Sequence, residues 1–209
     1  MIYARLAVAF LVTALLSPVA CNDKATPDDQ QAHIADVLAK GGVVDSILPI
    51  AELLDRFRKP LADKPDTLRH ASASIKALVT RWTLAVASND TAALNAMLLD
   101  RAEFAWLYYP GSKMSLPPYE APPQLLWGQM LATSEEGAQN ILKKFAANSF
   151  KIGGVNCPNP AVIEGGNRLH EGCLVQLETP NARAVDGAYF GTIIERDGRF
   201  KFVSYASRM

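Results

Sequence analysis

The sequence predicts an α+β protein in which N-terminal helices pack on a curved antiparallel sheet of about four to six strands. Helical patterns come first in the 209-residue chain, and short alternating segments follow them to the C-terminus. Asp197-Gly198 separates the last two of these segments, and this dipeptide favours a two-residue type I′ hairpin turn. The order of elements and the closing hairpin together predict antiparallel pairing.

The charge balance argues against a protein that binds nucleic acid. The chain carries 21 Lys and Arg against 21 Asp and Glu, with three His, whereas phosphate backbones are bound by basic surfaces. Hydrophobic residues make up 49% and charged residues 20% of the chain, which is typical of a protein that folds around a core. Composition alone does not indicate a specific biochemical activity.

Residues 31–66 are expected to form an N-terminal helical segment followed by a linker. Gly41-Gly42 breaks the pattern, and after this break Asp45 or Ser46 is suited to cap a second helix. The apolar stripe of that helix consists of Ile50, Leu53, Leu54 and Phe57. If this stripe is exposed, it favours docking on another protein.

The main domain is expected to span residues 67–209 and to open with a long helix at residues 71–88. Asp66 or Thr67 is the predicted cap. The apolar face of this helix follows the spacing of a stripe that packs on a core and consists of Ile75, Leu78, Val79, Trp82 and Val86. Asn89 or Asp90 caps a shorter second helix at residues 91–99.

Residues 101–121 form an aromatic and proline-rich stretch for which two structures are open. Phe104, Trp106 and Tyr108 alternate, as in a strand that carries its rings on one face. A helix fits so short a run nearly as well. Pro110 ends either element.

The remaining pattern predicts two helices and then four strands. Pro122-Pro123 opens a helix through Leu131, and Ser134 caps another through Ala147. The expected strands are residues 149–156, 168–178, 187–196 and 199–207. Along the second strand, one face carries Leu169, Glu171, Cys173, Val175 and Leu177.

This order of elements resembles the NTF2-like (SnoaL-like, cystatin-like cone) family. The resemblance lies in the long helix at residues 71–88, the short helix after Asn89-Asp90 and the closing hairpin at residues 189–205. It covers residues 67–209 and implies a cone in which the helices and the concave face of the sheet enclose a pocket. Members of the family that are enzymes line this pocket with an Asp or a His that acts as acid or base.

Residues 1–20 are expected to be a secretory signal peptide. Arg5 precedes an apolar run at residues 6–16 and a short exit of small residues, and this run is too short to span a bilayer. The sequence Val19-Ala20-Cys21-Asn22 resembles a bacterial lipobox, which implies that Cys21 becomes the lipidated first residue of the mature protein. Residues 21–30 then form a polar tether, and Asn22 resembles the signal for outer-membrane sorting in enterobacteria.

The expected lipidation of Cys21 determines which cysteines can pair with each other. Once Cys21 carries lipid, Cys157 and Cys173 remain, and export places them in an oxidising compartment. A disulfide between them closes a loop of roughly 16 residues and stabilises the fold by about 3 kcal/mol in the chain-entropy model. The alternative is two buried free thiols. The spacing of the Cys and His residues predicts no metal site.

Candidate catalytic residues come from the family resemblance, because common catalytic motifs are missing from the sequence. The resemblance implies an acid or base among Asp100, Arg101 and His170, with Glu103 and Glu171 as further candidates. Beside Arg101, the Asp100 carboxylate suits a clamp better than a base. Histidine is the residue best suited to act as a general base near neutral pH.

The aromatic stretch predicts a pocket for an apolar ligand. Its candidate lining residues are Trp106, Tyr108, Tyr109, Tyr119 and Trp127. Ordinary core packing of these rings is the alternative.

The sequence therefore predicts a noncatalytic module, lipid-anchored in the bacterial periplasm, that binds a small apolar ligand or an envelope protein. We expect no cofactor and no nucleic-acid partner. The alternative is a SnoaL-like isomerase, cyclase or hydrolase in which Asp100 or His170 is the acid or base.

Overall fold

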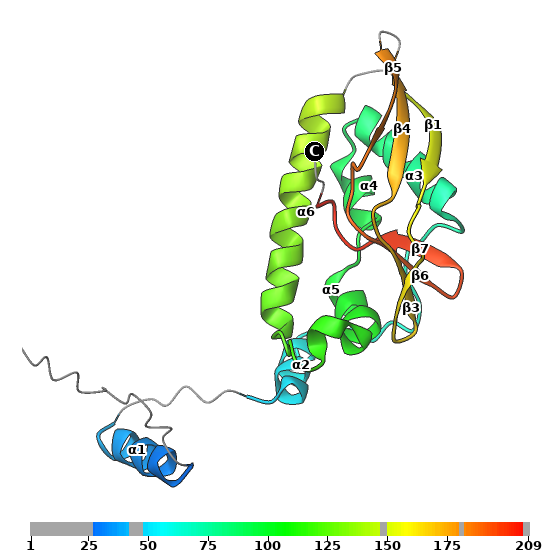
Figure 1. Ribbon diagram of the computed structural model, residues 1–209. Coiled ribbons are helices and arrows are strands. Elements are labelled where there is room, and N and C mark those ends of the chain that lie inside the picture. The colour runs from blue at the N-terminus through cyan, green and yellow to red at the C-terminus, as the bar shows by residue number, and fades with distance from the viewer. Residues whose placement is uncertain (1–26, 42–47, 147–149, 180–181, 207–209) are drawn as a thin grey trace, which may run out of the picture. The chain divides into compact units, whose positions relative to one another are not determined.

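The computed structural model describes residues 27–41, 48–146, 150–179 and 182–206 (Figure 1). The predicted signal peptide, Cys21 and the caps proposed at Asp45 and Ser46 lie outside these residues. The chain divides into two compact units, Met1–Ile47 and Leu48–Met209. In the first, helix α1 (Pro27–Ala39) includes the last four residues of the predicted tether.

The second unit begins before the predicted domain boundary and includes helix α2 (Ile50–Arg58). The Phe57 side chain is buried, and its ring meets the Phe104 ring edge-on with 5.6 Å between centroids. Ile50 and Leu54 pack on the same cluster. The apolar stripe of α2 therefore faces its own domain, so it does not provide the exposed docking surface that the sequence left open.

The two predicted helices that follow are present as α3 (Ile75–Ala87) and α4 (Thr91–Ala96). Four residues of the predicted stripe of α3 are fully buried: Leu78, Val79, Trp82 and Val86. The predicted cap at Asp66 or Thr67 is wrong, because Ser74 caps α3 by accepting a hydrogen bond from the Ala77 N–H. The cap at Asp90 is confirmed, since its carboxylate accepts from the Ala93 N–H.

The aromatic stretch is helical, so the strand alternative is wrong. It consists of α5 (Arg101–Glu103), a π-helical turn η1 (Phe104–Tyr108) and two 3₁₀ turns, η2 (Tyr109–Gly111) and η3 (Lys113–Ser115). A capping box starts the segment, because the Asp100 carboxylate and the Glu103 carboxylate each accept from the other residue's backbone N–H. The capping box favours a helix locally, and a helix buries aromatic rings on more than one face. These two effects outweigh the strand-like alternation of Phe104, Trp106 and Tyr108.

The two helices predicted after Pro122 are one continuous helix, α6 (Pro123–Phe145). Its start at Pro123 agrees with the prediction, but the break between Leu131 and Ser134 is absent. Ser134 is buried inside the helix, where its hydroxyl oxygen accepts a hydrogen bond from the Tyr205 N–H over 3.1 Å. Ser134 is therefore not a helix cap, and its hydroxyl makes a tertiary contact instead.

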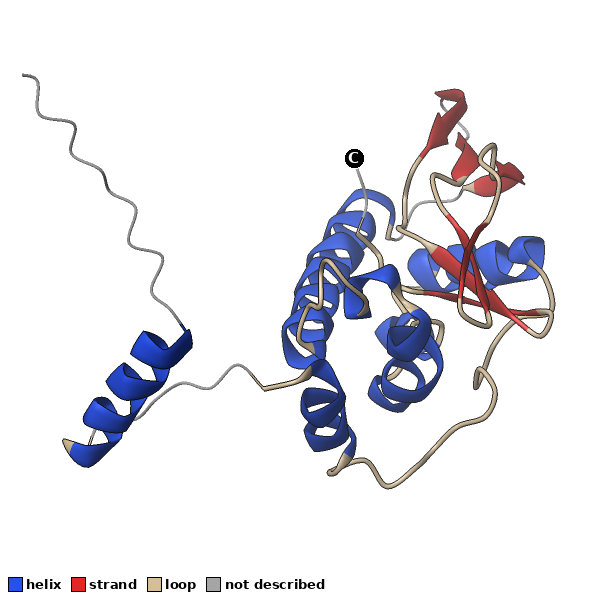
Figure 2. Ribbon diagram, turned by 60° about the horizontal axis from the view of Figure 1, so that its bottom comes forward, coloured by secondary structure: helices blue, strands red, loops and turns tan. Residues whose placement is uncertain are grey.

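The predicted α+β class is confirmed, because helices pack with antiparallel strands. The strands form two antiparallel sheets (Figure 2), so the single curved sheet of the prediction is wrong. The three-stranded sheet has the order β1 (Lys151–Asn156), β4 (Leu174–Thr179), β5 (Ala182–Gly187). The four-stranded sheet has the order β2 (Val162–Glu164), β3 (Asn167–His170), β6 (Ile193–Arg196), β7 (Arg199–Phe202). The expected strand at residues 168–178 is divided at Gly172, whose φ of 68° turns the chain from one sheet into the other.

The closing hairpin and the disulfide are both confirmed. Asp197 and Gly198 have positive φ values of 52° and 69° and join β6 to β7, as a type I′ turn requires. A disulfide links Cys157 and Cys173. Cys157 directly follows β1 and Cys173 directly precedes β4, so the bond lies at one end of the ladder between these two strands. Cys173 and Val175 lie in the main core with the buried face of α3.

Candidate functional site: a groove between two helices

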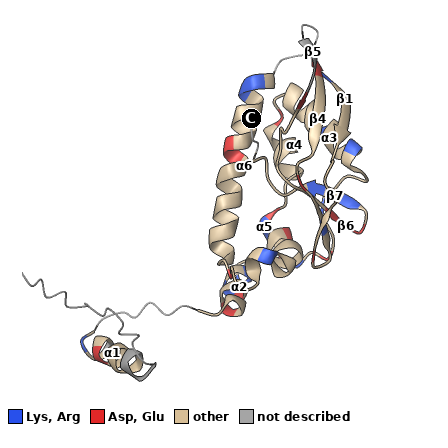
Figure 3. Cartoon of the chain, in the orientation of Figure 1, with Lys and Arg blue, Asp and Glu red and all other residues tan. Residues whose placement is uncertain are grey.

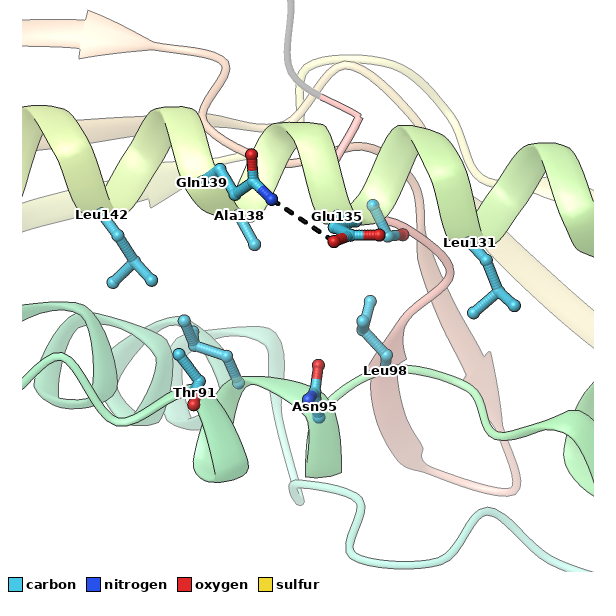
Figure 4. A pocket seen from close by; sticks show the side chains of 10 residues that line it. Thr91, Asn95, Leu98, Leu131, Glu135, Ala138, Gln139 and Leu142 are labelled. Carbon is cyan, nitrogen blue, oxygen red and sulfur yellow. Dashed lines mark hydrogen bonds between the residues drawn. The ribbon is translucent and has the colours of Figure 1, made fainter.

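An apolar groove lies between helices α4 and α6 and has a volume of about 440 Å³ (Figure 4). Helices α4 and α6 both pack on α3, and the groove is the space between α4 and α6. Most of its surface is apolar, although five of the ten described lining residues have polar side chains. The lining residues are Thr91, Leu94, Asn95, Leu98, Leu131, Ser134, Glu135, Ala138, Gln139 and Leu142.

The apolar wall comes from both helices and from the turn after α4. Leu131, Ala138 and Leu142 project from α6 toward α4, and Leu98 projects toward α6 (Figure 4). Leu94 is buried at the floor, whereas Leu131 is half exposed at one end. From Leu131 to Leu142, α6 extends about 16 Å at its normal rise per residue, so the groove is elongated.

The C-terminal segment ties the two walls of the groove together. The Tyr205 hydroxyl donates to the Leu94 carbonyl oxygen over 2.8 Å, and the Tyr205 N–H donates to Ser134. Burial raises the pKa of the Tyr205 hydroxyl well above its usual range, so this hydroxyl remains a donor. The spacing of α4 and α6 is thus fixed by hydrogen bonds to one residue.

In the described part of the chain, Glu135 is the single charged residue that lines the groove. Its carboxylate accepts a hydrogen bond from the Gln139 side-chain amide over 3.3 Å (Figure 4). Asn95 and Thr91 are the polar lining residues of α4. This combination of an apolar wall and few polar groups is typical of sites that bind small ligands.

The predicted aromatic pocket residues lie outside this groove. Phe104 is the centre of an aromatic cluster, with ring centroids 5.9 Å from Tyr108, 5.5 Å from Tyr109 and 5.2 Å from Trp127. Tyr109 is fully buried, and its hydroxyl donates to the Ala121 carbonyl. Most of these rings therefore pack the core, the alternative that the sequence left open.

The other two predicted pocket residues differ in exposure, because Trp106 is half-buried and packs on the same aromatic cluster. Tyr119 is exposed. The Arg58 guanidinium lies 3.8 Å from the centre of the Trp106 ring, and the Lys64 ammonium lies 4.7 Å from it. Arg58 also donates two hydrogen bonds to the Ala105 carbonyl, so it fixes α2 against the aromatic segment.

Asp100 and Arg101 have structural contacts. The Asp100 carboxylate caps α5 by accepting from the backbone N–H groups of Ala102 and Glu103, and it accepts from Arg69 over 2.7 Å. The Arg101 guanidinium lies 4.5 Å from the centre of the Phe57 ring. Capping and ion pairing explain the position of this carboxylate without a substrate.

Glu103 forms a buried ion pair that the sequence did not predict. Its side chain is 0% exposed and that of Lys201 is 2% exposed, with 2.7 Å between Glu103 Oε2 and Lys201 Nζ. Glu103 also accepts from the backbone N–H groups of Arg69 and Asp100. The pair joins α5 to β7, between residues too distant in sequence for a local pattern to reveal.

His170 belongs to a separate pair on the four-stranded sheet. Its Nε2 lies 2.8 Å from the Glu195 carboxylate, which also lies 3.4 Å from Arg168. Glu171 lines a different pocket, beside Gly172 and Phe190. The predicted catalytic residues thus divide among separate hydrogen-bond networks, and none of them lines the groove between α4 and α6.

The chain matches no family model, no curated protein and no solved structure. In the described part of the chain, no three His, Cys, Asp or Glu side chains are grouped so that they could hold a metal ion. Among the described helices, none has the length and apolar character to cross a membrane.

Sequence reasoning missed the groove because it divided α6 in two. With a break between Leu131 and Ser134, the apolar positions of the two halves do not form one surface. The missed signal is the spacing of Leu131, Ala138 and Leu142, which a single helix places on one side at intervals of seven and four residues.

Proposed function

We propose that this protein is a noncatalytic module that binds a small apolar ligand in the groove between α4 and α6. The observation that carries the proposal is the groove's volume of about 440 Å³ together with its leucine-rich wall. This volume is within the range of small-molecule sites, which are mostly apolar with a few placed polar groups. The predicted catalytic residues lie elsewhere, so binding is the activity that this groove supports.

Filling the groove is expected to weaken ligand binding. Ala138 lies in its wall, and Ala138→Leu adds branched apolar volume where the ligand would lie. We expect the affinity for Nile red, a neutral dye that fluoresces in apolar sites, to fall about tenfold. This factor corresponds to about 1.4 kcal/mol, which lies within the roughly 1–3 kcal/mol that overpacking typically costs. Fluorescence titration of the purified chain measures this affinity.

Ala132→Leu is the matched control for this experiment. Ala132 lies on the same helix, is exposed and is not a lining residue of the groove, so the same substitution there leaves dye affinity unchanged. Equal binding by wild type and Ala138→Leu would place the dye outside the groove and contradict the proposal.

The location of the module is proposed from its N-terminal sequence. Residues 1–20 have the pattern of a signal peptide, and Cys21 resembles a lipidation site; two or more acyl chains anchor a protein stably. Cys21→Ser is expected to block lipidation and move the protein from the detergent phase to the aqueous phase of a phase-separation assay. Unchanged partitioning would refute the lipid anchor and leave the groove proposal intact.

The NTF2-like assignment is also a proposal. It is supported by the order of the long helix α3, the short helix α4 and the closing hairpin β6–β7. The disulfide between Cys157 and Cys173 is consistent with an exported protein, because such bonds persist in oxidising compartments.

A further inference from the structure

We propose that the ligand of the α4–α6 groove is a single-chain amphiphile with a cationic head, such as an alkylamine, and that Glu135 selects this head. The inference rests on the proposed function of the groove and adds the chemical class of its ligand. An apolar chain would lie along Leu98, Ala138 and Leu142, and the head would lie at the polar edge formed by Glu135.

The charges at the groove favour a cation over an anion. Among the lining residues that the structure describes, Glu135 is the charged one. Among the described residues, the Glu135 carboxylate accepts one hydrogen bond, from Gln139. The carboxylate thus has further lone pairs that a ligand ammonium can use. Figure 3 shows the acidic residues of α6 midway along the helix and its basic residues at the C-terminal end.

The groove balances the charge of an anionic head less well than the charge of a cationic head. The basic residues of α6, Lys143 and Lys144, follow Leu142 and do not line the groove. At the α4 end, the Asp90 carboxylate caps the helix and accepts from the Ala93 N–H, which adds negative charge next to Thr91. A carboxylate or phosphate head would therefore meet like charge at Glu135 and no cation among the described lining residues.

The shape of the groove favours one extended chain. The apolar wall extends about 16 Å along α6, and Ala138 leaves space between the larger side chains of Leu131 and Leu142 (Figure 4). Because Glu135 and Ala138 are three residues apart on one helix, a ligand can contact the apolar wall and the carboxylate at once.

The test compares three ligands with the same chain and different heads: decylamine, decanol and decanoate, at pH 7. All are used below the solubility limit of decanol and below the critical micelle concentrations of the two ionic ligands. Displacement of Nile red from the full chain measures their affinities. Decylamine is expected to bind about two- to fivefold more tightly than decanol, the range of an exposed ion pair, and decanoate more weakly than both. The preference for decylamine should shrink in high salt.

Two neighbouring variants separate the role of Glu135 from the net charge of the protein. Glu135→Gln is expected to make decylamine and decanol bind equally, whereas Glu136→Gln retains the preference, because Glu136 is exposed and does not line the groove. Equal affinities for the three ligands in wild type, or a preference that survives Glu135→Gln, would overturn this inference alone. If none of the three ligands displaces the dye, the proposed function itself fails.

Discussion

Lys201→Met is expected to destabilise the protein by about 3–5 kcal/mol, the usual cost of leaving one partner of a buried ion pair uncompensated. The Lys201 ammonium lies 2.7 Å from the Glu103 carboxylate, and neither side chain has appreciable contact with solvent. Methionine fills the volume of the lysine stem but removes the charge that balances Glu103. Urea denaturation monitored by tryptophan fluorescence measures the change in the free energy of unfolding.

A double variant shows whether the pair or the lysine alone is responsible. Glu103→Gln/Lys201→Met removes both charges, and Gln can still serve in the capping box with Asp100. We expect the double variant to recover part of the stability lost by Lys201→Met, since an uncharged buried pair has less desolvation penalty. Additive losses would show that the two side chains do not interact.

Lys113→Met is the matched control at an exposed site. The Lys113 ammonium lies 4.0 Å from Glu164, and its side chain is 62% exposed. Glu164 is buried, but it keeps the hydrogen bond that it accepts from the Lys113 backbone N–H in this variant. An ammonium as exposed as that of Lys113 contributes about 0–1 kcal/mol to an ion pair, so this variant should unfold close to wild type. A loss below about 1 kcal/mol in Lys201→Met as well would contradict the burial of the Glu103–Lys201 pair.

Gly137→Ala is expected to cost about 3 kcal/mol, because the added methyl group has no space. A Cβ on Gly137 would overlap the Tyr205 carbonyl oxygen, and this backbone oxygen cannot relieve the overlap by a change of rotamer. Relief requires movement of α6 or of the C-terminal segment, which is at the upper end of overpacking costs. The same movement would disturb the Tyr205 hydrogen bonds that fix the groove walls.

Gly128→Ala tests the same substitution where space is available. Gly128 also lies in α6, and nothing lies within 4 Å of a Cβ there. Alanine is the better helix former, so this variant should be more stable by about 0.5–1 kcal/mol. The two variants should therefore shift the thermal midpoint in opposite directions, and a stabilised Gly137→Ala would show that α6 does not contact Tyr205 as described.

The features that the sequence predicted correctly are governed by local chemistry. The Asp197-Gly198 turn needs two residues that accept positive φ, and both are adjacent in the sequence. Asp90 caps α4 through a contact three residues away. The stripe on α3 is set by helical spacing alone.

The features that the sequence did not predict depend on contacts between distant segments. Serine is a common helix cap, but the Ser134 hydroxyl accepts a hydrogen bond from the Tyr205 N–H and α6 continues through this residue. The strand predicted at residues 168–178 has one alternating pattern, yet a left-handed Gly172 sends its two halves into different sheets. Periodicity cannot distinguish these cases, because it describes a segment without its neighbours.

The sequence also did not predict the candidate site, because this site too depends on contacts between distant segments. The aromatic residues near Phe104 have the composition of a ligand pocket, but they pack on one another and on α2. The groove instead joins α4 to the middle of α6, and its walls are held by Tyr205 from the C-terminal segment. Each of these three segments has an unremarkable sequence by itself.

Native mass spectrometry of the purified full chain tests the ligand-binding groove most directly, because it needs no assumption about the ligand. We expect wild type and Ala132→Leu to carry an adduct of discrete mass that organic solvent extracts, and Ala138→Leu to lack it. A ligand of the proposed class would appear in the extract as an amine with an alkyl chain. A wild-type protein without any adduct, or an adduct that Ala138→Leu retains in full, would contradict the assignment of this groove as the functional site.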